Sequence, residues 1–188
     1  MPKRVPLRFE QCLHGARSVG VALDLSPKDR ALHALPMFHI GALVDLFFAP
    51  LMFGGSLVIA EGKEPSFLRE AVLEGGATWM QLVPTMLARC LDDLPADDRR
   101  NMGQRLRFIR SASSDLAVPQ HLRAEDAFDE TPLVQIYGMT ETSGQITSNP
   151  PSIAKRRPGT VGMPAGAEVS IRDACGAALD YGAVGEVC

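Results

Sequence analysis

The stretch 77-ATWMQLVPTMLARCLDDLPADDRRNMGQRLRFIR-110 contains two apolar, strand-like segments on either side of a helical one. Residues 77–83 predict the first strand, a helix from Pro84 to about Leu94 follows, and 106-LRFIR-110 predicts the second strand. This order of strand, helix and strand is typical of parallel βαβ units. The stretch therefore favours the α/β class.

The flanking sequence continues this alternation. Helices are expected at 8–23, 41–53, 65–74 and 119–129, and strands at 31–35, 56–60 and 133–137. Right-handed crossovers between parallel strands place helices on both faces of a sheet. We therefore predict an α/β fold with a parallel sheet and helices on both faces, in which the strand at 56–60 is buried.

The composition of the sequence changes after residue 150. Glycine and proline become frequent, and 167-AEVSIRD-173 alternates like a half-exposed strand. We predict that residues 1–155 form the α/β part and that residues 156–188 begin a β-rich subdomain. The strand-like 184-VGEVC-188 ends as if cut, so we expect the chain to be an excerpt of a longer protein.

Bulk composition narrows the class of protein. A net charge of -3 over 188 residues gives no reason to expect nucleic acid or an anionic membrane as a partner. The longest apolar stretch, residues 40–55, is broken by Asp45 and Pro50 and predicts a buried helix instead of a membrane span. The scattered cysteines and the lack of a signal peptide predict a cytoplasmic protein with reduced thiols.

Three polar, small-residue-rich loops follow predicted strands. They are 36-PMFHIGA-42, 111-SASSDLA-117 and 138-GMTETSGQITSNP-150. In open parallel sheets, ligands bind outside the carboxyl ends of the strands. In the third loop, the Thr140 hydroxyl suits a phosphate and the Glu141 carboxylate suits a magnesium ion. The loops therefore indicate a nucleotide site.

Plainer interpretations of the same residues stay open at this point. His39 could be a core histidine, the serines of the second loop could be turn or cap residues, and Tyr137 could be a strand-end aromatic. Glu141 could be a solvated carboxylate. We interpret Trp79 as core, and the basic run 155–157 as a solvated loop.

Several segments together resemble one enzyme family. The string 137-YGMTE-141 resembles the adenine-and-phosphate motif of the adenylate-forming, or AMP-binding, superfamily. Further segments resemble motifs of that family in the family's order: 2-PKRVPL-7, 35-LPMFHIGAL-43, 82-LVPTML-87, 111-SASSDL-116, 158-PGTVGMPAGAEVSIRD-173 and 185-GEVC-188. The likeness covers essentially the whole chain. Within the superfamily, the segments further resemble the oxalate-CoA-ligase-like branch of acyl-CoA synthetases, although that branch usually has a histidine where Gly144 stands.

The resemblance implies an internal part of the large N-terminal domain of an acyl-CoA synthetase. Such a ligase joins a small-molecule carboxylic acid to AMP from ATP, with Mg²⁺, and then transfers the acyl group to CoA. It would place the whole protein in acyl and fatty acid metabolism.

The resemblance also implies roles for single residues. Tyr137 would stack on adenine, Gln135 would approach its exocyclic amine, and Thr140 would contact the α-phosphate. Glu141 would hold Mg²⁺, and His39 would orient the carboxylate. The remaining cofactor-binding residues that it implies are Ser113, Ser114, Asp115, Ile136, Gly138 and Met139. The acyl pocket would be lined near Phe38, Ile40, Gly41, Ser111, Ile136, Gly144 and Gln145.

Parts of the family's site have no counterpart in these residues. The resemblance puts the glycine-rich phosphate loop before Met1, and it puts the ribose-binding aspartate and catalytic lysine beyond Cys188. We therefore expect the isolated chain to be inactive. Arg4, where the family usually has glycine, leaves the conformation of the opening turn undecided.

Alternatives and details of the pocket remain open. The chain could belong to an adenylation domain that loads a carrier-protein thiol. Against this alternative, there is no aspartate early in a pocket segment that we can assign to a substrate amino group. It could also be a non-catalytic fragment that binds nucleotide or partners. A homo-oligomer is possible. A dicarboxylate would need a cation, and Arg110, the nearby candidate, is expected to face elsewhere.

Overall fold

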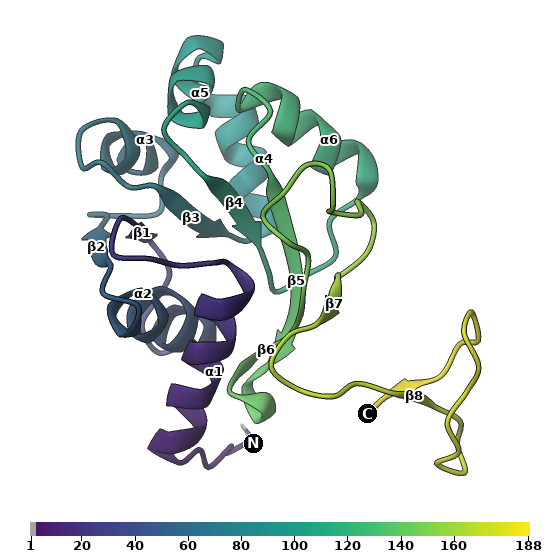
Figure 1. Cartoon of the computed structure of the whole chain (residues 1–188). Coiled ribbons are helices and arrows are strands. Elements are labelled where there is room, and N and C mark those ends of the chain that lie inside the picture. Colours follow the sequence, from purple (N-terminus) through teal and green to yellow (C-terminus); the bar gives the residue numbers. More distant parts are fainter. Residues whose placement is uncertain (1–2) are drawn as a thin grey trace.

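The computed structural model describes residues 3–188 and contains a seven-stranded sheet of order β2-β1-β3-β4-β5-β6-β7 (Figure 1). The strands are β1 Arg30–His33, β2 Ser56–Ile59, β3 Trp79–Leu82, β4 Phe108–Ser111, β5 Leu133–Met139, β6 Gly144–Ser148 and β7 Met163–Pro164. Every neighbouring pair from β2 to β5 is parallel, whereas β6 and β7 add antiparallel strands at one edge. The predicted parallel sheet is confirmed, with this antiparallel extension.

The helices connect the parallel strands. They are α1 Phe9–Ala22, the π-helix η1 Gly41–Phe48, α2 Ala49–Met52, α3 Pro65–Leu73, α4 Pro84–Asp93, α5 Ala96–Gly103 and α6 Val118–Ala127. Pro65 and Pro84 stand at the first helical positions, where a missing N–H costs nothing because it would have no helical partner. All predicted helices are present, and α5 is an additional one.

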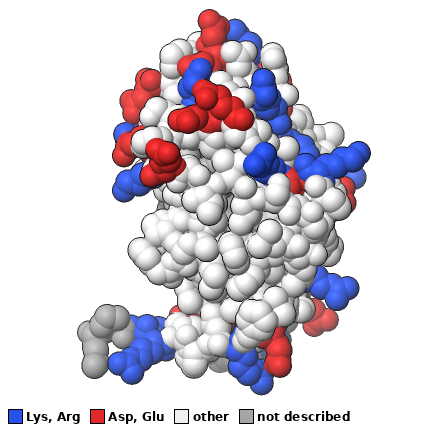
Figure 2. Space-filling model, turned by 90° about the vertical axis from the view of Figure 1, so that its left-hand side faces the viewer, with Lys and Arg blue, Asp and Glu red and all other residues white. Residues whose placement is uncertain are grey.

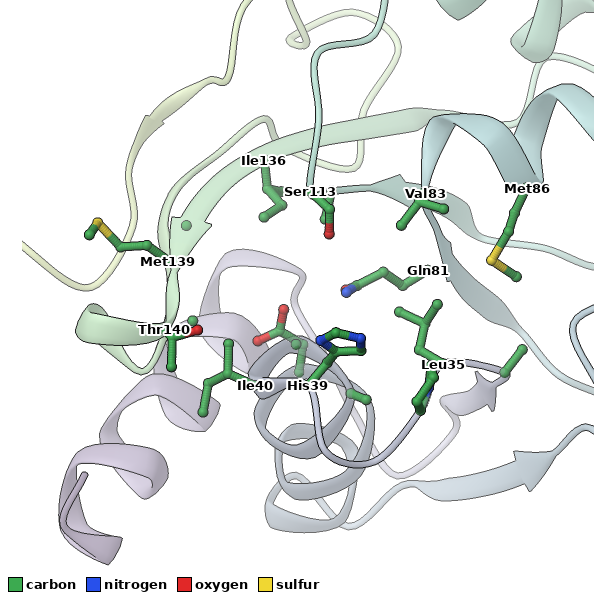
Figure 3. A pocket seen from close by; sticks show the side chains of 18 of the residues that line it. Leu35, His39, Ile40, Gln81, Val83, Met86, Ser113, Ile136, Met139 and Thr140 are labelled. Atoms are coloured by element: carbon green, nitrogen blue, oxygen red, sulfur yellow. The ribbon is translucent and has the colours of Figure 1, made fainter. Parts of the chain in front are cut away.

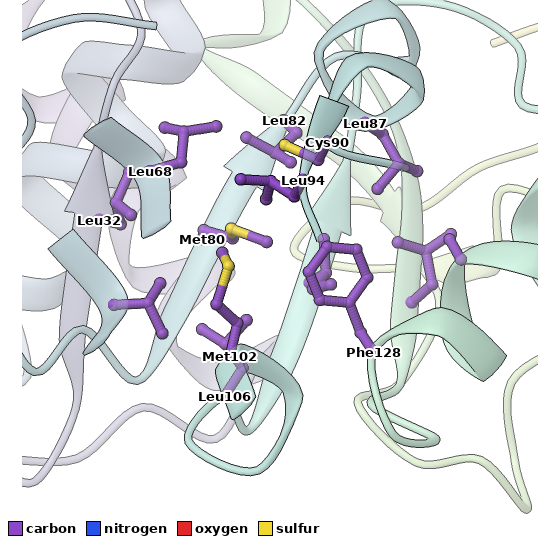
Figure 4. Packing of buried hydrophobic residues seen from close by; sticks show 14 of the residues in the cluster. Leu32, Leu68, Met80, Leu82, Leu87, Cys90, Leu94, Met102, Leu106 and Phe128 are labelled. Carbon is purple, nitrogen blue, oxygen red and sulfur yellow. The ribbon is translucent and has the colours of Figure 1, made fainter. Parts of the chain in front are cut away.

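Two apolar clusters lie on opposite faces of the sheet, because neighbouring strand residues point to opposite sides. In β3, Trp79 packs into the cluster with α1 and η1, and Met80 packs into the cluster with α3 to α6. Phe108 and Ile109 of β4 divide in the same way. Figure 4 shows the second cluster, where Met80 and Phe128 lie between the sheet and its helices. The helices therefore cover both faces, and Trp79 is core as predicted.

The strand β2 differs from its prediction. It is an edge strand whose residues are exposed or half-buried, and Ile59 is 71% exposed. Figure 2 faces the side of the molecule that bears this edge and shows a wide surface without charged side chains. The expected burial of 56–60 is therefore wrong, because within the described residues no further strand pairs with β2.

The last residues form a separate ribbon. The strands β8 Ile171–Arg172 and β9 Glu186–Val187 pair antiparallel as a two-stranded sheet. The strand β7 lies beyond residue 155 and yet pairs with the main sheet, so the division at 155/156 stays a prediction. Across residues 3–188, no helix is both long and apolar enough for a membrane crossing.

The basic run 155–157 is only partly the solvated loop that we expected. Lys155 and Arg157 are exposed, but the Arg156 guanidinium is partly buried and pairs with the buried carboxylate of Glu125 on α6. Glu125 also accepts a hydrogen bond from the Leu133 N–H at 2.9 Å. This carboxylate therefore ties the loop after β6 to α6 and to the start of β5.

Acid is expected to weaken this connection. Burial alone would raise the pKa of Glu125, but hydrogen bonds from Arg156, His121 and the Leu133 N–H outweigh it and lower the pKa from 4.5 to about 2. A carboxyl group with a lowered folded-state pKa stabilises the fold above its unfolded pKa and loses that contribution as the pH falls toward its folded pKa. Stability should therefore fall between about pH 4.5 and pH 2.

The variant Glu125→Gln tests this expectation by urea unfolding across that pH range. It should be less stable than wild type at pH 7 and should lose less stability on acidification. Asp126→Asn, which removes an exposed carboxyl group from the same helix, should follow the wild-type pH curve. Parallel curves for wild type and Glu125→Gln would contradict the assignment.

Candidate nucleotide and acyl site

The carboxyl ends of β1, β3, β4 and β5 open on one cavity of about 530 Å³ (Figure 3). The cavity is lined by Ala34, Leu35, Pro36, His39, Ile40, Gly41, Ala42, Asp45, Lys63, Gln81, Val83, Thr85, Met86, Ala112, Ser113, Ile136, Gly138, Met139, Thr140 and Gly144. Its place agrees with the crevice that open parallel sheets offer to ligands.

Many of the predicted site residues meet in this cavity. His39, Ser113, Ile136, Gly138, Met139 and Thr140 line it, as do Ile40, Gly41 and Gly144 of the predicted acyl pocket. His39 lies just before η1, and its carbonyl oxygen accepts hydrogen bonds from the Ala42 and Leu43 N–H groups at 3.0 Å. In Figure 3 the His39 ring and Thr140 lie on the same side of the cavity, opposite Ser113 and Ile136.

The third polar loop is shorter than predicted, because 144-GQITS-148 is the buried strand β6. It forms a hairpin with β5 through the short 3-10 helix η2 Thr140–Thr142. The Thr142 hydroxyl lies 2.9 Å from the Met139 carbonyl oxygen and 3.0 Å from that of Gly144, and closes the turn. The hairpin leaves Thr140 facing the cavity.

Glycine at position 138 permits this hairpin. A Cβ atom there would lie 2.2 Å from the Gly144 carbonyl oxygen, so no larger residue fits without a shift of the backbone. The pairing of the strands also shifts register between Tyr137 and Gly138. The glycine of the YGMTE string therefore serves the close approach of two strands.

Four predicted nucleotide residues lie outside the lining of the cavity. Ser114 and Asp115 are exposed in the loop after β4, while Gln135 is buried and Tyr137 is 37% exposed on β5. The strands β4 and β5 pair with Ser111 opposite Gln135, so the loop after β4 and Tyr137 leave neighbouring strands. The assignment of the adenine to these residues stays a prediction.

Three predicted acyl-pocket residues do not line the cavity. Phe38 is 85% exposed and its ring lies next to that of His39, with centroids 4.6 Å apart and the ring planes tilted by 45°. Ser111 and Gln145 are buried and absent from the cavity lining. Each of the three is next in sequence to a residue of the lining, namely His39, Ala112 and Gly144, so their place near the acyl pocket stays a prediction.

Glu141 lies beside the N-terminal segment of the described chain. Lys3 Nζ is 2.6 Å from Glu141 Oε1, and both side chains are solvent-accessible. The hydrogen bond from Lys3 lowers the pKa of Glu141, so this carboxylate stays ionised. Within residues 3–188, no three His, Cys, Asp or Glu side chains gather as a metal site. A single carboxylate fits Mg²⁺ that arrives with nucleotide phosphates, because Mg²⁺ in such sites takes few protein ligands.

Below the cavity lies a buried ionic network that the sequence did not predict. Arg110 is fully buried, and its Nη1 donates to Asp45 Oδ2 at 2.6 Å and to the side-chain oxygen Oε1 of Gln81. Its Nη2 donates to Gln145 Oε1 at 2.8 Å. Asp45 and Gln81 also line the cavity. Arg110 itself does not line the cavity, in agreement with the expectation that it faces elsewhere, while Asp45 is an aspartate of the lining that was not predicted for the pocket.

Comparisons with known proteins agree with this geometry. The sequence model of the family described as "AMP-binding enzyme" matches residues 1–188. The chain is 34% identical over 186 residues to an oxalate–CoA ligase of Saccharomyces cerevisiae and, at the same identity and length, to a sulfoacetate–CoA ligase of Cupriavidus necator. These alignments cover 99% of this chain but 33% and 36% of the two relatives. The chain thus spans about a third of their length.

A solved structure gives the same result for the fold. O-succinylbenzoate coenzyme A synthetase of Bacillus subtilis, in complex with ATP and a magnesium ion, superposes with a TM-score of 0.80 and 28% identity. The superposition covers 97% of this chain and 37% of that one. The cavity and the β5–β6 hairpin therefore belong to a fold that also occurs in a structure with bound nucleotide.

Proposed function

We propose, from the premise that this chain belongs to the AMP-binding enzyme family, that the complete protein is an ATP-dependent acyl-activating ligase. It would convert a carboxylate and ATP into acyl-AMP and pyrophosphate, and then transfer the acyl group to CoA. The relatives named as CoA ligases support the class of reaction.

The observation that carries this proposal is the β5–β6 hairpin, which holds Thr140 at the rim of the cavity that His39 also lines. The cavity would take the acyl group, and its rim would receive the α-phosphate. A carboxylate and a triphosphate repel each other, so the reaction needs groups that align them and neutralise their charge. Thr140 would donate to the phosphate, and His39 would orient the attacking carboxylate.

Each step balances without a protein nucleophile. A carboxylate oxygen attacks the α-phosphorus, and the α–β phosphoanhydride bond breaks to release pyrophosphate. The CoA thiolate then attacks the acyl carbon, and AMP leaves with the carboxylate oxygen. When bound, Mg²⁺ would neutralise phosphate charge. Glu141 is the described residue that we propose to hold it.

The finer parts of the proposal stand on the family resemblance. They are Mg²⁺, CoA as acyl acceptor, a role in fatty acid metabolism, a cytoplasmic location and the inactivity of the isolated 188-residue chain. Substrate-dependent pyrophosphate exchange by the isolated chain would refute the last of these. A homo-oligomer stays a prediction, and concentration-dependent size in light scattering would support it.

The acyl acceptor separates the proposal from its main alternative. We expect the complete protein to form thioester with CoA at a rate at least about tenfold above that with a carrier-protein phosphopantetheine, because Met139 stands where many peptide-synthetase domains have proline. Thioester formation with both acceptors, measured at equal concentration, decides the question. A faster reaction with the carrier protein would favour the alternative.

A further inference from the structure

The floor of the cavity is polar, although most of its walls are apolar. Asp45 and Gln81 are the buried polar side chains of its lining. Behind them, the guanidinium group of Arg110 donates hydrogen bonds to both side chains. Figure 3 shows the Gln81 amide nitrogen directed at the middle of the cavity. The end of a bound acyl group would therefore meet hydrogen-bonding atoms.

One of the hydrogen-bonding positions that remain open on these side chains is an acceptor, and the other is a donor. Arg110 binds Asp45 Oδ2 and the side-chain oxygen Oε1 of Gln81, which leaves Gln81 Nε2 and a second acceptor position on Asp45 Oδ2 for other partners. Asp45 Oδ1 is closed off from solvent, and therefore from a ligand in the cavity. Oδ2 can only accept a hydrogen bond, and Nε2 can only donate one. The ligand group that matches this floor is therefore one that both donates and accepts a hydrogen bond.

Two glycines border this floor, and Gly41 leaves it accessible. A Cβ atom on Gly144 would lie 3.1 Å from Asp45 Oδ1, and one on Gly41 would lie 3.2 Å from Gln81 Nε2 and 3.6 Å from Asp45 Oδ2. A side chain at position 41 would stand where a ligand atom could contact Gln81 Nε2 and Asp45 Oδ2, whereas one at position 144 would press against the enclosed Oδ1. The positive φ of Gly144, 110°, is a second reason for glycine at that position.

We propose that the cavity selects acyl groups whose far end is a neutral hydrogen-bonding group, a hydroxyl above all. This group would donate to Asp45 Oδ2 and accept from Gln81 Nε2. Arg110 is a positioning residue, because it holds both side chains in place without lining the cavity. This inference rests on the proposed function, since it names the substrate class of the same site.

Charge separates this class from its competitors. The Asp45–Arg110 pair has no net charge, so the floor offers no net compensation for an ionised end group that leaves water. A second carboxylate would meet the Asp45 oxygen directly, and an ammonium would meet the Gln81 N–H donors. A methyl end would leave Gln81 Nε2 without a partner, and a buried polar atom that stays unpaired is costly.

The test uses the complete protein and four matched sets of acids that differ only at the far end: hydroxyl, methyl, carboxylate and ammonium. AMP formation gives kcat/KM for each acid at several chain lengths. At the best length, the hydroxy acid should exceed the methyl acid roughly tenfold to a hundredfold, and the charged acids should be poorer than the hydroxy acid by at least as much.

Two variants probe the floor, and a third is the control. Gln81→Met removes the donor, and Gly41→Ala fills the space in front of Gln81 and Asp45. Each should lower the ratio of kcat/KM between hydroxy and methyl acids at least about fivefold, whereas a general folding defect lowers both values together. Gln104→Met, on an exposed residue at the end of α5, should leave the ratio unchanged.

The outcomes separate this inference from the function on which it rests. AMP formation with none of the acids would overturn the proposed ligase function. AMP formation that favours the methyl, carboxylate or ammonium end would overturn the inference and leave the ligase function in place. A preference for the hydroxy acid that neither Gln81→Met nor Gly41→Ala reduces would also overturn the assignment of the floor.

Discussion

Replacing Glu141 with glutamine is expected to slow carboxylate-dependent AMP formation by the complete protein roughly a hundredfold or more, because the metal loses its proposed carboxylate ligand. The substitution keeps the size of the side chain and removes its charge. Glu141 is solvent-accessible and pairs with Lys3, so the fold should tolerate the change. Initial rates at increasing Mg²⁺ concentrations are the measurement.

A matched control separates the site from a general change in charge. Glu130→Gln neutralises an exposed carboxylate in the turn before β5, at the other end of the strand, and should keep the wild-type rate. The Glu141→Gln enzyme should also need more Mg²⁺ for half-maximal rate. Wild-type rates and an unchanged Mg²⁺ requirement would show that Glu141 is only a surface partner of Lys3.

Replacing Arg110 with methionine should lower the free energy of unfolding by roughly 3–5 kcal/mol, since it leaves the Asp45 carboxylate buried without its ion-pair partner. The amide oxygens of Gln81 and Gln145 would also lose their donor. Urea unfolding gives the overall change. Hydrogen exchange of peptides from β3 and β4 shows whether the loss is local to the network.

The double variant Asp45→Leu with Arg110→Met is the control for this prediction. It removes both charges, and buried ion pairs replaced by apolar residues often keep most of the stability. We expect it to be clearly more stable than Arg110→Met alone, with a coupling between the two sites of about 1–3 kcal/mol. Additive losses would contradict the view that Asp45 and Arg110 act as a pair.

The parallel part of the fold was predictable because its signal is local. Apolar runs such as 106-LRFIR-110 predict strands on their own, and prolines and glycines mark the helix ends. Helix α5 was missed because 96-ADDRRNMG-103 is mostly polar and buries only Met102 and Gly103. A helix with so narrow an apolar face has little periodicity to detect.

The site was predictable where it follows single strands and unpredictable where distant residues pair. His39 and Thr140 follow predicted strands, so their meeting at one edge of the sheet could be anticipated. The sequence of strand β6 looked too polar for a strand. It can be buried because Gln145 accepts a hydrogen bond from Arg110 and Thr147 donates one to the Val161 carbonyl oxygen. Such partners are far away in sequence, so a local sequence pattern does not predict them.

Transfer of oxygen-18 from a labelled carboxylic acid into AMP tests the central claim most directly. If the complete protein activates its substrate as an acyl-adenylate, the carboxylate oxygen that attacks the α-phosphorus stays on AMP when the thiolate displaces it. We predict AMP that carries one labelled oxygen in the presence of acid, ATP, Mg²⁺ and CoA. Unlabelled AMP, or ADP and labelled phosphate in its place, would contradict the account.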